Sequence, residues 1–572
     1  MSLPETTHFV IEQTIRFISP TAVAAEWALT AVAAVLIAWA PWGSGKTLRI
    51  WRNRFRRLAQ NKRAAILICA LLPVCVRLSM LSFAPVPEPS IHDEFSHLLA
   101  ADTLAQGRLT NPTHPLWKHF ESIHIIQQPT YNSMYPPAQG FFLAVGQVLF
   151  HEPWASVVIG VALMCGAICW MMQGWLPPAW AFFGALVVIV KVGLSGLWMN
   201  SYMGGAVPAA GGALLIGSLP RLRSKEPRAV HGLWLGAGLV ILMNSRPFEG
   251  SVLGCAALIY LCAGWWRCDW PQRRRVLKLL TPAALLLVCG FAFTAFYNWK
   301  VTGNPLRMPY QVNRDTYGWP ENLAFLPLKQ VTLRHKALQD MYALEARRRD
   351  IYTSTDRFIE NLAIRIFDSW SFFIGPILTV ALVLLPWIWQ DRRTRPLHIF
   401  MGVMAALNLF QMVLFPYHLG PIVPIIFTLV AQALRHVYVG IGRSNRLRGI
   451  YFAMILPVFL IVVGAMKQQA ENIGIPLTYW EHAAENHRDA RAYIQGWLAS
   501  RPAKQLVVVR YSAEHEPSRE WVYNRADIDH SKVVWAREMD KESNARLRDY
   551  FRDREAWLLA ADVLPPHLVR WQ

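Results

Sequence analysis

The stretch WASVVIGVALMCGAICWMMQG, residues 154–174, carries no charged side chain over its 21 positions. A helix of this length is about 30 Å long, which matches the hydrocarbon core of a lipid bilayer. Other apolar runs lie on both sides of it, and together they number twelve. They occupy roughly residues 23–42, 64–84, 154–174, 178–198, 204–220, 230–245, 251–266, 276–297, 369–389, 397–415, 421–438 and 449–466. The sequence therefore predicts a polytopic α-helical membrane protein with about 12 transmembrane helices.

The composition of the chain excludes other classes of protein. Of its 572 residues, 54% are hydrophobic and 16% are charged, whereas about 25% of the residues of a soluble globular protein are charged. The chain also contains 25 Trp and 27 Phe residues, and aromatic rings concentrate in protein cores and at bilayer interfaces. A disordered or wholly soluble chain is therefore excluded.

The net charge of +20 is concentrated in a few short segments between the apolar runs. Five such segments, near residues 46–63, 221–228, 267–278, 392–395 and 443–448, contain 23 of the 57 Lys and Arg residues. Basic loops of membrane proteins face the cytoplasm and the anionic lipid headgroups there. The charge therefore predicts membrane topology and contact with membrane lipids, and we expect no nucleic-acid partner.

The number of crossings between these basic loops fixes the remaining topology. The loops at 46–63 and 221–228 lie on one side, yet five apolar runs separate them when residues 138–150 are counted. That run is too short to span a bilayer, so we expect it to form a juxtamembrane helix. The segments 85–135 and 298–368 and the chain after 467 then face the outside of a bacterial-type inner membrane. Glu26 interrupts the first span, so the N-terminus can lie on either side of the membrane.

The expected organisation has three parts. Residues 1–63 form an N-terminal helix and a basic cytoplasmic loop, residues 64–466 form the membrane domain, and residues 467–572 form a small α/β domain outside the cytoplasm. In that last part the pattern predicts helices at 481–499 and 541–552 and strands at Gln505–Arg510, Lys532–Trp535 and Glu555–Leu559. The sequence does not distinguish whether this domain binds the acceptor or stabilises the fold. All eight cysteines lie within or beside predicted spans, so the outer segments contain neither a disulfide framework nor a cysteine metal site. They are Cys69, Cys75, Cys165, Cys169, Cys255, Cys262, Cys268 and Cys289.

The first outer segment, 85–135, has the highest density of chemically active side chains. Asp93 and Glu94 lie where the chain leaves the membrane and a short amphipathic helix begins. A carboxylate at such a boundary is partly desolvated, which raises its pKa and suits a general base. The alternative is structural, because acidic residues in the first turn stabilise a helix through its dipole.

The segment resembles a known family of enzymes. His92-Asp93-Glu94-Phe95-Ser96 after a transmembrane helix, followed by Tyr135-Pro136-Pro137 at the start of another apolar helix, is similar to the GT-C superfamily of membrane glycosyltransferases. The most similar branch is family 39, which includes protein O-mannosyltransferases and lipid A aminoarabinose transferases. The resemblance covers roughly residues 64–440 in layout. It implies that Asp93 is the catalytic residue, with Glu94 assisting it or capping the helix.

The resemblance also implies the reaction. Enzymes of this type transfer a sugar from a polyprenyl-phosphate donor to a lipid, glycan or protein acceptor at the outer face of the membrane. Phosphate is a good leaving group, so the protein has to deprotonate the acceptor hydroxyl and neutralise the phosphate. Asp93 would be the base. Neither the sugar nor the acceptor follows from the sequence.

The residues expected around the donor phosphate depart from the family pattern. Tyr135 replaces the family's Lys, and Arg246 in Asn244-Ser245-Arg246-Pro247 offers a substitute cation, unless it pairs with Glu249 one turn away. Tyr417 and His418 resemble the family's Arg/Lys-Tyr motif near the lipid phosphate. The second outer loop lacks the family's acidic residue, and its sugar-binding candidates are Asn200 and Tyr202.

Two alternatives remain open at this stage. His92, Asp93 and His97 could converge on a divalent metal ion, although we expect no cofactor because family 39 uses none. A lipid or glycan transporter, or a catalytically silent assembly partner, would also fit a polytopic membrane protein. Charged residues within apolar spans are typical of transporters, and the clearest examples here are Arg77 and Lys191.

Overall fold

The computed structural model describes residues 20–39, 46–194, 196–265, 270–318, 323–412, 414–472, 479–517, 519–563 and 565–571. Parts of several predicted features lie outside these residues. They are residues 1–19 of the N-terminal part, the end of the first span at 40–42, residue 266 with Arg267 and Cys268, and residues 473–478 of the C-terminal part. The seven cysteines in the described chain form no disulfide.

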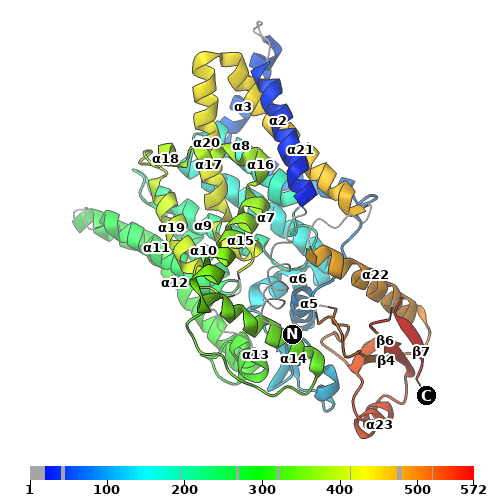
Figure 1. Cartoon of the computed structure of the whole chain (residues 1–572). Coiled ribbons are helices and arrows are strands. Elements are labelled where there is room, and N and C mark those ends of the chain that lie inside the picture. The colour runs from blue at the N-terminus through cyan, green and yellow to red at the C-terminus, as the bar shows by residue number, and fades with distance from the viewer. Residues whose placement is uncertain are drawn as a thin grey trace.

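Helices form at every predicted span (Figure 1). They are α2 (Pro20–Ala38), α4 (Lys62–Ser79), α7 (Pro153–Trp175), α8 (Pro178–Val188), α9 (Ala206–Leu222), α10 (Ala229–Met243), α11 (Pro247–Trp265), α12 (Trp270–Thr302), α15 (Thr355–Phe373), α16 (Gly375–Leu378), α17 (Val380–Val383), α18 (Leu385–Ile388), α19 (Arg395–Asn408), α20 (Val423–Ser444) and α21 (Arg446–Asn472). The basic helix α3 (Lys46–Gln60) joins α2 to α4. The charge-free run that forms α7 packs against α4 and α9, and α10 packs against α9 and α12.

Fewer of these helices are full-length spans than the sequence predicts. Within the described residues, four stretches are long and apolar enough to cross a membrane: α7, Leu277–Thr302, Pro416–Ser444 and Arg446–Met466. The pair Thr355–Phe373 and Gly375–Val383 would be a fifth, but it bends by 87°. Six further apolar helices have 10–17 residues. The predicted count of about 12 is therefore not reached by this measure among the described residues, because six apolar helices are shorter than 18 residues and the pair at 355–383 is bent where Gly375 has a φ of 66°.

The charges buried among the apolar helices have protein partners. Arg77 donates hydrogen bonds to Asn200 Oδ1 at 3.2 Å and to the carbonyls of Ala84 and Pro85 at 2.7 and 2.9 Å. Lys191 Nζ lies 3.8 Å from Glu26 Oε1, and both side chains are buried. These contacts satisfy charges that would otherwise be costly in an apolar environment.

The outer segment 85–135 folds into α5 (His92–Ala105) and a small antiparallel sheet of β1 (Asn111–Pro112), β3 (Thr130–Ser133) and β2 (Ile125–Ile126), with a 3₁₀ turn at Trp117–Phe120. The predicted short run forms α6 (Pro137–Phe150). The segment after α12 contains α13 (Pro309–Tyr317) and α14 (Lys336–Arg347). Figure 1 shows α13 and α14 at the end of the molecule opposite α3.

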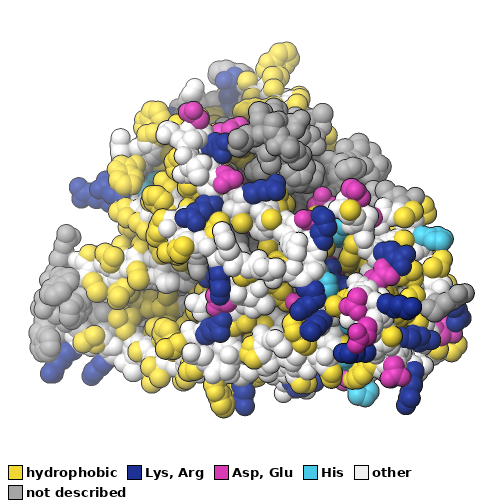
Figure 2. Space-filling view, turned by 60° about the horizontal axis from the view of Figure 1, so that its bottom comes forward, with side chains coloured by type: hydrophobic (Ala, Val, Ile, Leu, Met, Phe, Trp, Pro, Cys, Tyr) yellow, Lys and Arg dark blue, Asp and Glu magenta, His cyan; other side chains and the backbone are white. Residues whose placement is uncertain are grey.

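The chain after α21 forms a four-stranded sheet with the order β5-β4-β6-β7. Its strands are β4 (Gln505–Arg510), β5 (Val533–Arg537), β6 (Glu555–Ala560) and β7 (His567–Arg570), and its helices are α22 (Tyr479–Ser500) and α23 (Lys541–Tyr550). β4 is parallel to β5 and β6, whereas β7 is antiparallel to β6. Figure 2 shows charged side chains of both signs on the side of the surface where Figure 1 places this sheet.

This sheet shares a hydrophobic core with the first outer segment. Phe95 and Leu99 of α5 are buried together with Leu506, Val508 and Tyr523, and the Phe95 and Tyr523 rings stack with centroids 4.2 Å apart. The C-terminal part is therefore built onto the helix that begins with Asp93, rather than standing apart from it.

Asp102 joins α5 to the chain between β4 and β5, and its effect on stability depends on pH. It accepts hydrogen bonds from Arg525 at 2.7 Å and from the Ala526 amide at 2.8 Å. Burial opposes ionisation, but these bonds outweigh it and hold the pKa of Asp102 below its ordinary value. Such a group stabilises the fold above its unfolded pKa of about 3.9, and the contribution is lost as pH falls through the lower folded value.

We expect Asp102→Asn to lower the free energy of unfolding by about 1.5–3 kcal/mol near pH 7, the size of one charge-assisted hydrogen bond. The difference from the wild type should shrink as the pH falls below about 4, because the unfolded chain then protonates Asp102 first, and it should vanish below the lower pKa of the folded state. Thermal unfolding of the purified protein in detergent at several pH values measures this. A difference that grows at low pH would contradict the assignment.

Candidate active site

Glu94 holds the start of α5 in place. Its Oε2 accepts hydrogen bonds from the Ser90 amide at 2.8 Å, the Ser90 hydroxyl at 3.1 Å and the Ile91 amide at 3.2 Å. Its Oε1 accepts from the Tyr202 amide at 3.0 Å. Both oxygens therefore serve as helix-capping and loop-positioning acceptors, as the capping alternative expects for Glu94.

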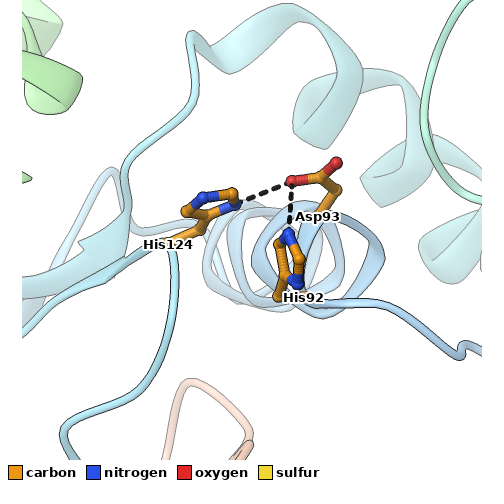
Figure 3. Close-up of side chains that lie close together, drawn as sticks. All are labelled: His92, Asp93 and His124. Atoms are coloured by element: carbon orange, nitrogen blue, oxygen red, sulfur yellow. Dashed lines mark hydrogen bonds and ion pairs between the residues drawn. The ribbon is translucent and has the colours of Figure 1, made fainter. Parts of the chain in front are cut away.

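Asp93, one residue earlier, faces a different set of groups (Figure 3). His124 Nδ1 lies 2.7 Å from Asp93 Oδ1, and His92 Nε2 lies 3.8 Å from the same oxygen. The Tyr135 hydroxyl also donates a hydrogen bond to Oδ1. Figure 3 shows the second oxygen on the far side of the carboxyl group from both rings. Within the described chain no hydrogen bond reaches this oxygen, Oδ2, and the Asp93 side chain is 14% exposed.

His124 is brought to Asp93 by an unusual backbone conformation. Its φ of 60° lies in the left-handed region, which non-glycine residues adopt rarely and which recurs at functional sites. The His124 carbonyl accepts hydrogen bonds from the Ser96 hydroxyl at 2.7 Å and the Met134 amide at 3.2 Å. The ring is thus held by α5 and by the chain after β3, 31 positions from Asp93 in sequence.

The pKa of Asp93 differs from the sequence-based expectation. Burial of the carboxyl group favours the protonated form, but the His92 ring, the hydrogen bond from His124 and the hydrogen bond from Tyr135 outweigh it. Together they hold the pKa of Asp93 well below its ordinary value. The expectation of a raised pKa is therefore wrong, because desolvation at the boundary is overcome by hydrogen-bond donors that the sequence does not reveal. Asp93 is an ionised acceptor at neutral pH.

The side chains next to this carboxylate are uncharged rings. Burial lowers the pKa of His92 and of His97 to about 4, so both are neutral at pH 7. The His97 ring stacks on Tyr135 with centroids 4.5 Å apart. Burial, and then the charge of Asp93, raise the pKa of Tyr135 well above its ordinary value. Tyr135 therefore keeps its proton and donates a hydrogen bond to Asp93. It does not supply the cation that the family has at this position.

Arg246 supplies a positive charge to the same site. It lies between α10 and α11, and it acts electrostatically on His97, Tyr135 and Tyr417. No carboxylate of the described residues lies within ion-pair distance of its guanidinium group. The pairing with Glu249 is not formed, since Glu249 Oε1 accepts a hydrogen bond from Gln411 at 2.9 Å instead. Arg246 is thus available for an anion.

The other predicted site residues divide into two groups. Tyr417 lies within electrostatic reach of Asp93 and Arg246, and the His418 ring contacts it edge-on with centroids 4.6 Å apart. Asn200 accepts a hydrogen bond from Arg77, and the Tyr202 hydroxyl donates to the Pro87 carbonyl at 3.0 Å. The structure therefore brings Tyr417 and His418 to the site, while Asn200 and Tyr202 serve the protein framework.

Glu121 joins three parts of the chain close to His124, and sequence analysis missed it. Its carboxylate lies 2.7 Å from Arg334 and 3.2 Å from His335, both from the outer segment 298–368. Its carbonyl accepts a hydrogen bond at 2.6 Å from Arg537, at the end of β5. No local pattern marks such a residue, because these three partners lie more than 200 positions away.

The structure also changes the predicted set of metal ligands. His92, Asp93 and His124 each offer a ligand atom, and these atoms lie within 4.8 Å of one another. In the metal alternative left open by the sequence, His97 is the third ligand, but its ring stacks on Tyr135. Among the described residues, His124 takes that place.

Comparisons with known proteins complete the description. No family model matches the chain, and no curated protein matches its sequence. Its structure is similar to that of the aminoarabinose transferase ArnT from Cupriavidus metallidurans bound to undecaprenyl phosphate, with 12% identity, a TM-score of 0.49 and coverage of 86% of this chain and 94% of that one. The oligosaccharyltransferase from Archaeoglobus fulgidus, in complex with Zn and sulfate, is also similar, with 12% identity and a TM-score of 0.45. That likeness covers 78% of this chain and 60% of the other. Both of these proteins are GT-C membrane glycosyltransferases.

Proposed function

We propose that this chain is a membrane glycosyltransferase that moves a sugar from a polyprenyl-phosphate donor to an acceptor hydroxyl at the outer face of a bacterial-type inner membrane. The observation that carries the proposal is that Asp93 is ionised and held in place through only one of its two oxygens. One oxygen of this ionised carboxylate is held by His124 and Tyr135, and the other has no partner in the described chain. A fixed carboxylate with one available oxygen suits proton acceptance, and an arginine whose charge acts on the rings around that carboxylate suits a nearby anion.

The reaction follows from these two groups. Asp93 Oδ2 accepts the proton of the acceptor hydroxyl while that oxygen bonds to the anomeric carbon of the sugar. The bond between the anomeric carbon and the phosphate oxygen breaks, and the electron pair leaves with the polyprenyl phosphate. Arg246 neutralises the charge of this leaving group, and two parallel hydrogen bonds to phosphate are within the reach of a guanidinium group. A single displacement of this kind inverts the anomeric configuration.

A carboxylate with a low pKa is adequate for this chemistry. The transition states of glycosyl transfer resemble an oxocarbenium ion, so the acceptor oxygen loses its proton late, when it has become strongly acidic. The site therefore needs an oriented hydrogen-bond acceptor more than a strong base. We infer that no metal cofactor is required, because phosphate leaves readily and Arg246 carries the compensating charge.

The test uses purified full-length protein in detergent with polyprenyl-phosphate pentose and hexose donors and a lipid extract of bacterial membranes as the acceptor source. We expect the release of polyprenyl phosphate and the appearance of a glycosylated product, both in the presence of EDTA. Movement of lipid or glycan across sealed proteoliposomes without a new glycosidic bond would instead support a transporter. The absence of both activities would support a silent assembly partner.

Arg246→Gln is expected to raise the KM for the donor by about 10- to 100-fold, because a hydrogen bond to a charged group contributes about 1.5–3 kcal/mol. Arg246→Lys should recover part of this, since it keeps the charge but loses the two-point geometry. Steady-state kinetics with varied donor concentration measure the effect. The matched control is Arg228→Gln, an exposed arginine at the other end of α10, which should leave the KM unchanged. An equal effect of both variants would contradict the assignment of Arg246.

A further inference from the structure

Two imidazole rings flank the Asp93 carboxylate in a fixed arrangement. His124 Nδ1 and His92 Nε2 lie 2.7 and 3.8 Å from Asp93 Oδ1. The two rings are nearly perpendicular, at 86°, with centroids 4.4 Å apart. Two imidazole nitrogens and one carboxylate oxygen form a ligand set that favours Zn²⁺ over Mg²⁺ or Ca²⁺, which prefer oxygen ligands alone.

The separations suit a zinc ion after small adjustments. Bonds of about 2.0–2.1 Å in a tetrahedral site place neighbouring ligand atoms about 3.3 Å apart. The observed separations of 2.7 and 3.8 Å lie on either side of this value. His92 and Asp93 are consecutive in the first turn of α5, and the His124 carbonyl is anchored by Ser96. The third separation, between the ligand atoms of His92 and His124, is within 4.8 Å, so shifts on the order of an ångström bring the three atoms to coordination distance.

A fourth ligand position is also accessible. The Asp93 side chain is 14% exposed, which leaves an approach for a water molecule. The Tyr135 hydroxyl lies 2.8 Å from His124 Nδ1 and bonds to Asp93, so it is placed to hydrogen-bond to a metal-bound water. Three protein ligands and one water are typical of open zinc sites.

A zinc ion at this position would compete with the proposed reaction. It would bind Asp93 Oδ1 and take the place of the proton on His124 Nδ1, because metal ligands must be deprotonated. The charge of the bound Zn²⁺ would make Asp93 Oδ2 a poorer acceptor for the proton of a hydroxyl group. Arg246, whose charge already acts on His97 and Tyr135, would repel a second cation and favour reversible binding over permanent occupancy.

We propose that His92, Asp93 and His124 form a binding site for Zn²⁺ and that Zn²⁺ bound there reversibly inhibits the enzyme. The binding stands on the geometry of the cluster, whereas the inhibition rests on the proposed function, in which Asp93 is the base.

Binding is measured first, by calorimetric titration of the metal-free full-length protein with ZnCl₂. We expect one site that Mg²⁺ does not fill, and a loss of affinity of at least about tenfold in His92→Gln. The matched control is His530→Gln, because His530 forms an exposed pair with Asp527, 3.0 Å apart, and no third metal ligand of the described residues lies with them. Equal zinc binding by the wild type and His92→Gln would overturn the site.

Inhibition is measured next, as the transfer rate of each variant relative to its own rate in EDTA. The zinc concentration for half inhibition should rise at least about tenfold in His92→Gln and stay unchanged in His530→Gln. Excess EDTA should restore the wild-type rate. Activation by Zn²⁺, or inhibition that His92→Gln does not weaken, would overturn the proposal. Failure of the proposed function would appear differently, as a lack of transfer in EDTA, and the binding titration does not depend on it.

Discussion

Replacing Asp93 with Asn is expected to lower the turnover of sugar transfer by about 10³-fold, within the range that general-base catalysis contributes. The amide has nearly the same shape, but it carries no charge and cannot accept the acceptor proton. The substitution also replaces one of the two carboxylate oxygens, both hydrogen-bond acceptors, with an NH₂ group, which is a donor. The KM for the donor should change little, because Arg246 remains. Initial rates at saturating donor, with protein amount and melting temperature matched, measure this.

Two further variants show whether the effect belongs to the carboxylate. Tyr135→Phe keeps the ring that stacks on His97 but removes the hydrogen bond to Asp93, so its loss of turnover should be smaller, about tenfold. Asp315→Asn removes a half-exposed carboxylate of the outer segment 298–368 that pairs with Arg307 and Lys329. The turnover of this variant should be near that of the wild type. Full activity of Asp93→Asn would end the assignment of Asp93 as the base.

Replacing Arg537 with Ala is expected to lower the free energy of unfolding by about 3–5 kcal/mol, the cost of removing one partner of a buried ion pair. The side chains of Arg537 and Glu520 are 2% and 1% exposed, and they form a direct ion pair. Arg537 also donates to the Glu121 carbonyl, three residues before His124. The variant should therefore loosen the C-terminal sheet and, through Glu121, the loop that positions His124. Thermal unfolding in detergent and proteolysis of the C-terminal part measure the first effect.

The same sheet offers a matched control. Arg510 ends β4 as Arg537 ends β5, and it forms two hydrogen bonds with Glu538, but its side chain is 56% exposed. Because exposed pairs contribute little, Arg510→Ala should cost less than about 1 kcal/mol. The double variant Glu520→Gln/Arg537→Ala should recover part of the stability, since no unpaired charge then remains buried. Equal behaviour of Arg510→Ala and Arg537→Ala would contradict this account.

The contrast between Asp93 and Glu94 shows how far local sequence reasoning extends. Both are acidic residues at the start of one helix, and the pattern predicts that helix and a capping role for one of them. Glu94 caps the helix through the nearby Ser90 and Ile91 amides, and the Tyr202 amide, 108 positions away, occupies its other oxygen. Which residue is available for catalysis depends on where His124 and Tyr135 lie.

The sequence by itself determined the features that arise from near neighbours. Long apolar runs placed the helices, short runs of β-branched and other apolar residues placed β4, β5 and β6, and the family-like motif singled out Asp93. These follow from periodicity and composition, which act over a few residues.

Only the tertiary structure decided the features that depend on distant contacts. It lowered the pKa of Asp93 by bringing donors to it, exchanged His97 for His124 beside the carboxylate, left Arg246 without a carboxylate partner in the described chain, and fixed the outer loop through Arg537. The physical reason is that a hydrogen bond or ion pair between residues hundreds of positions apart is set by how helices and strands pack. The packing of those elements has no signature in the local order of the residues that finally meet.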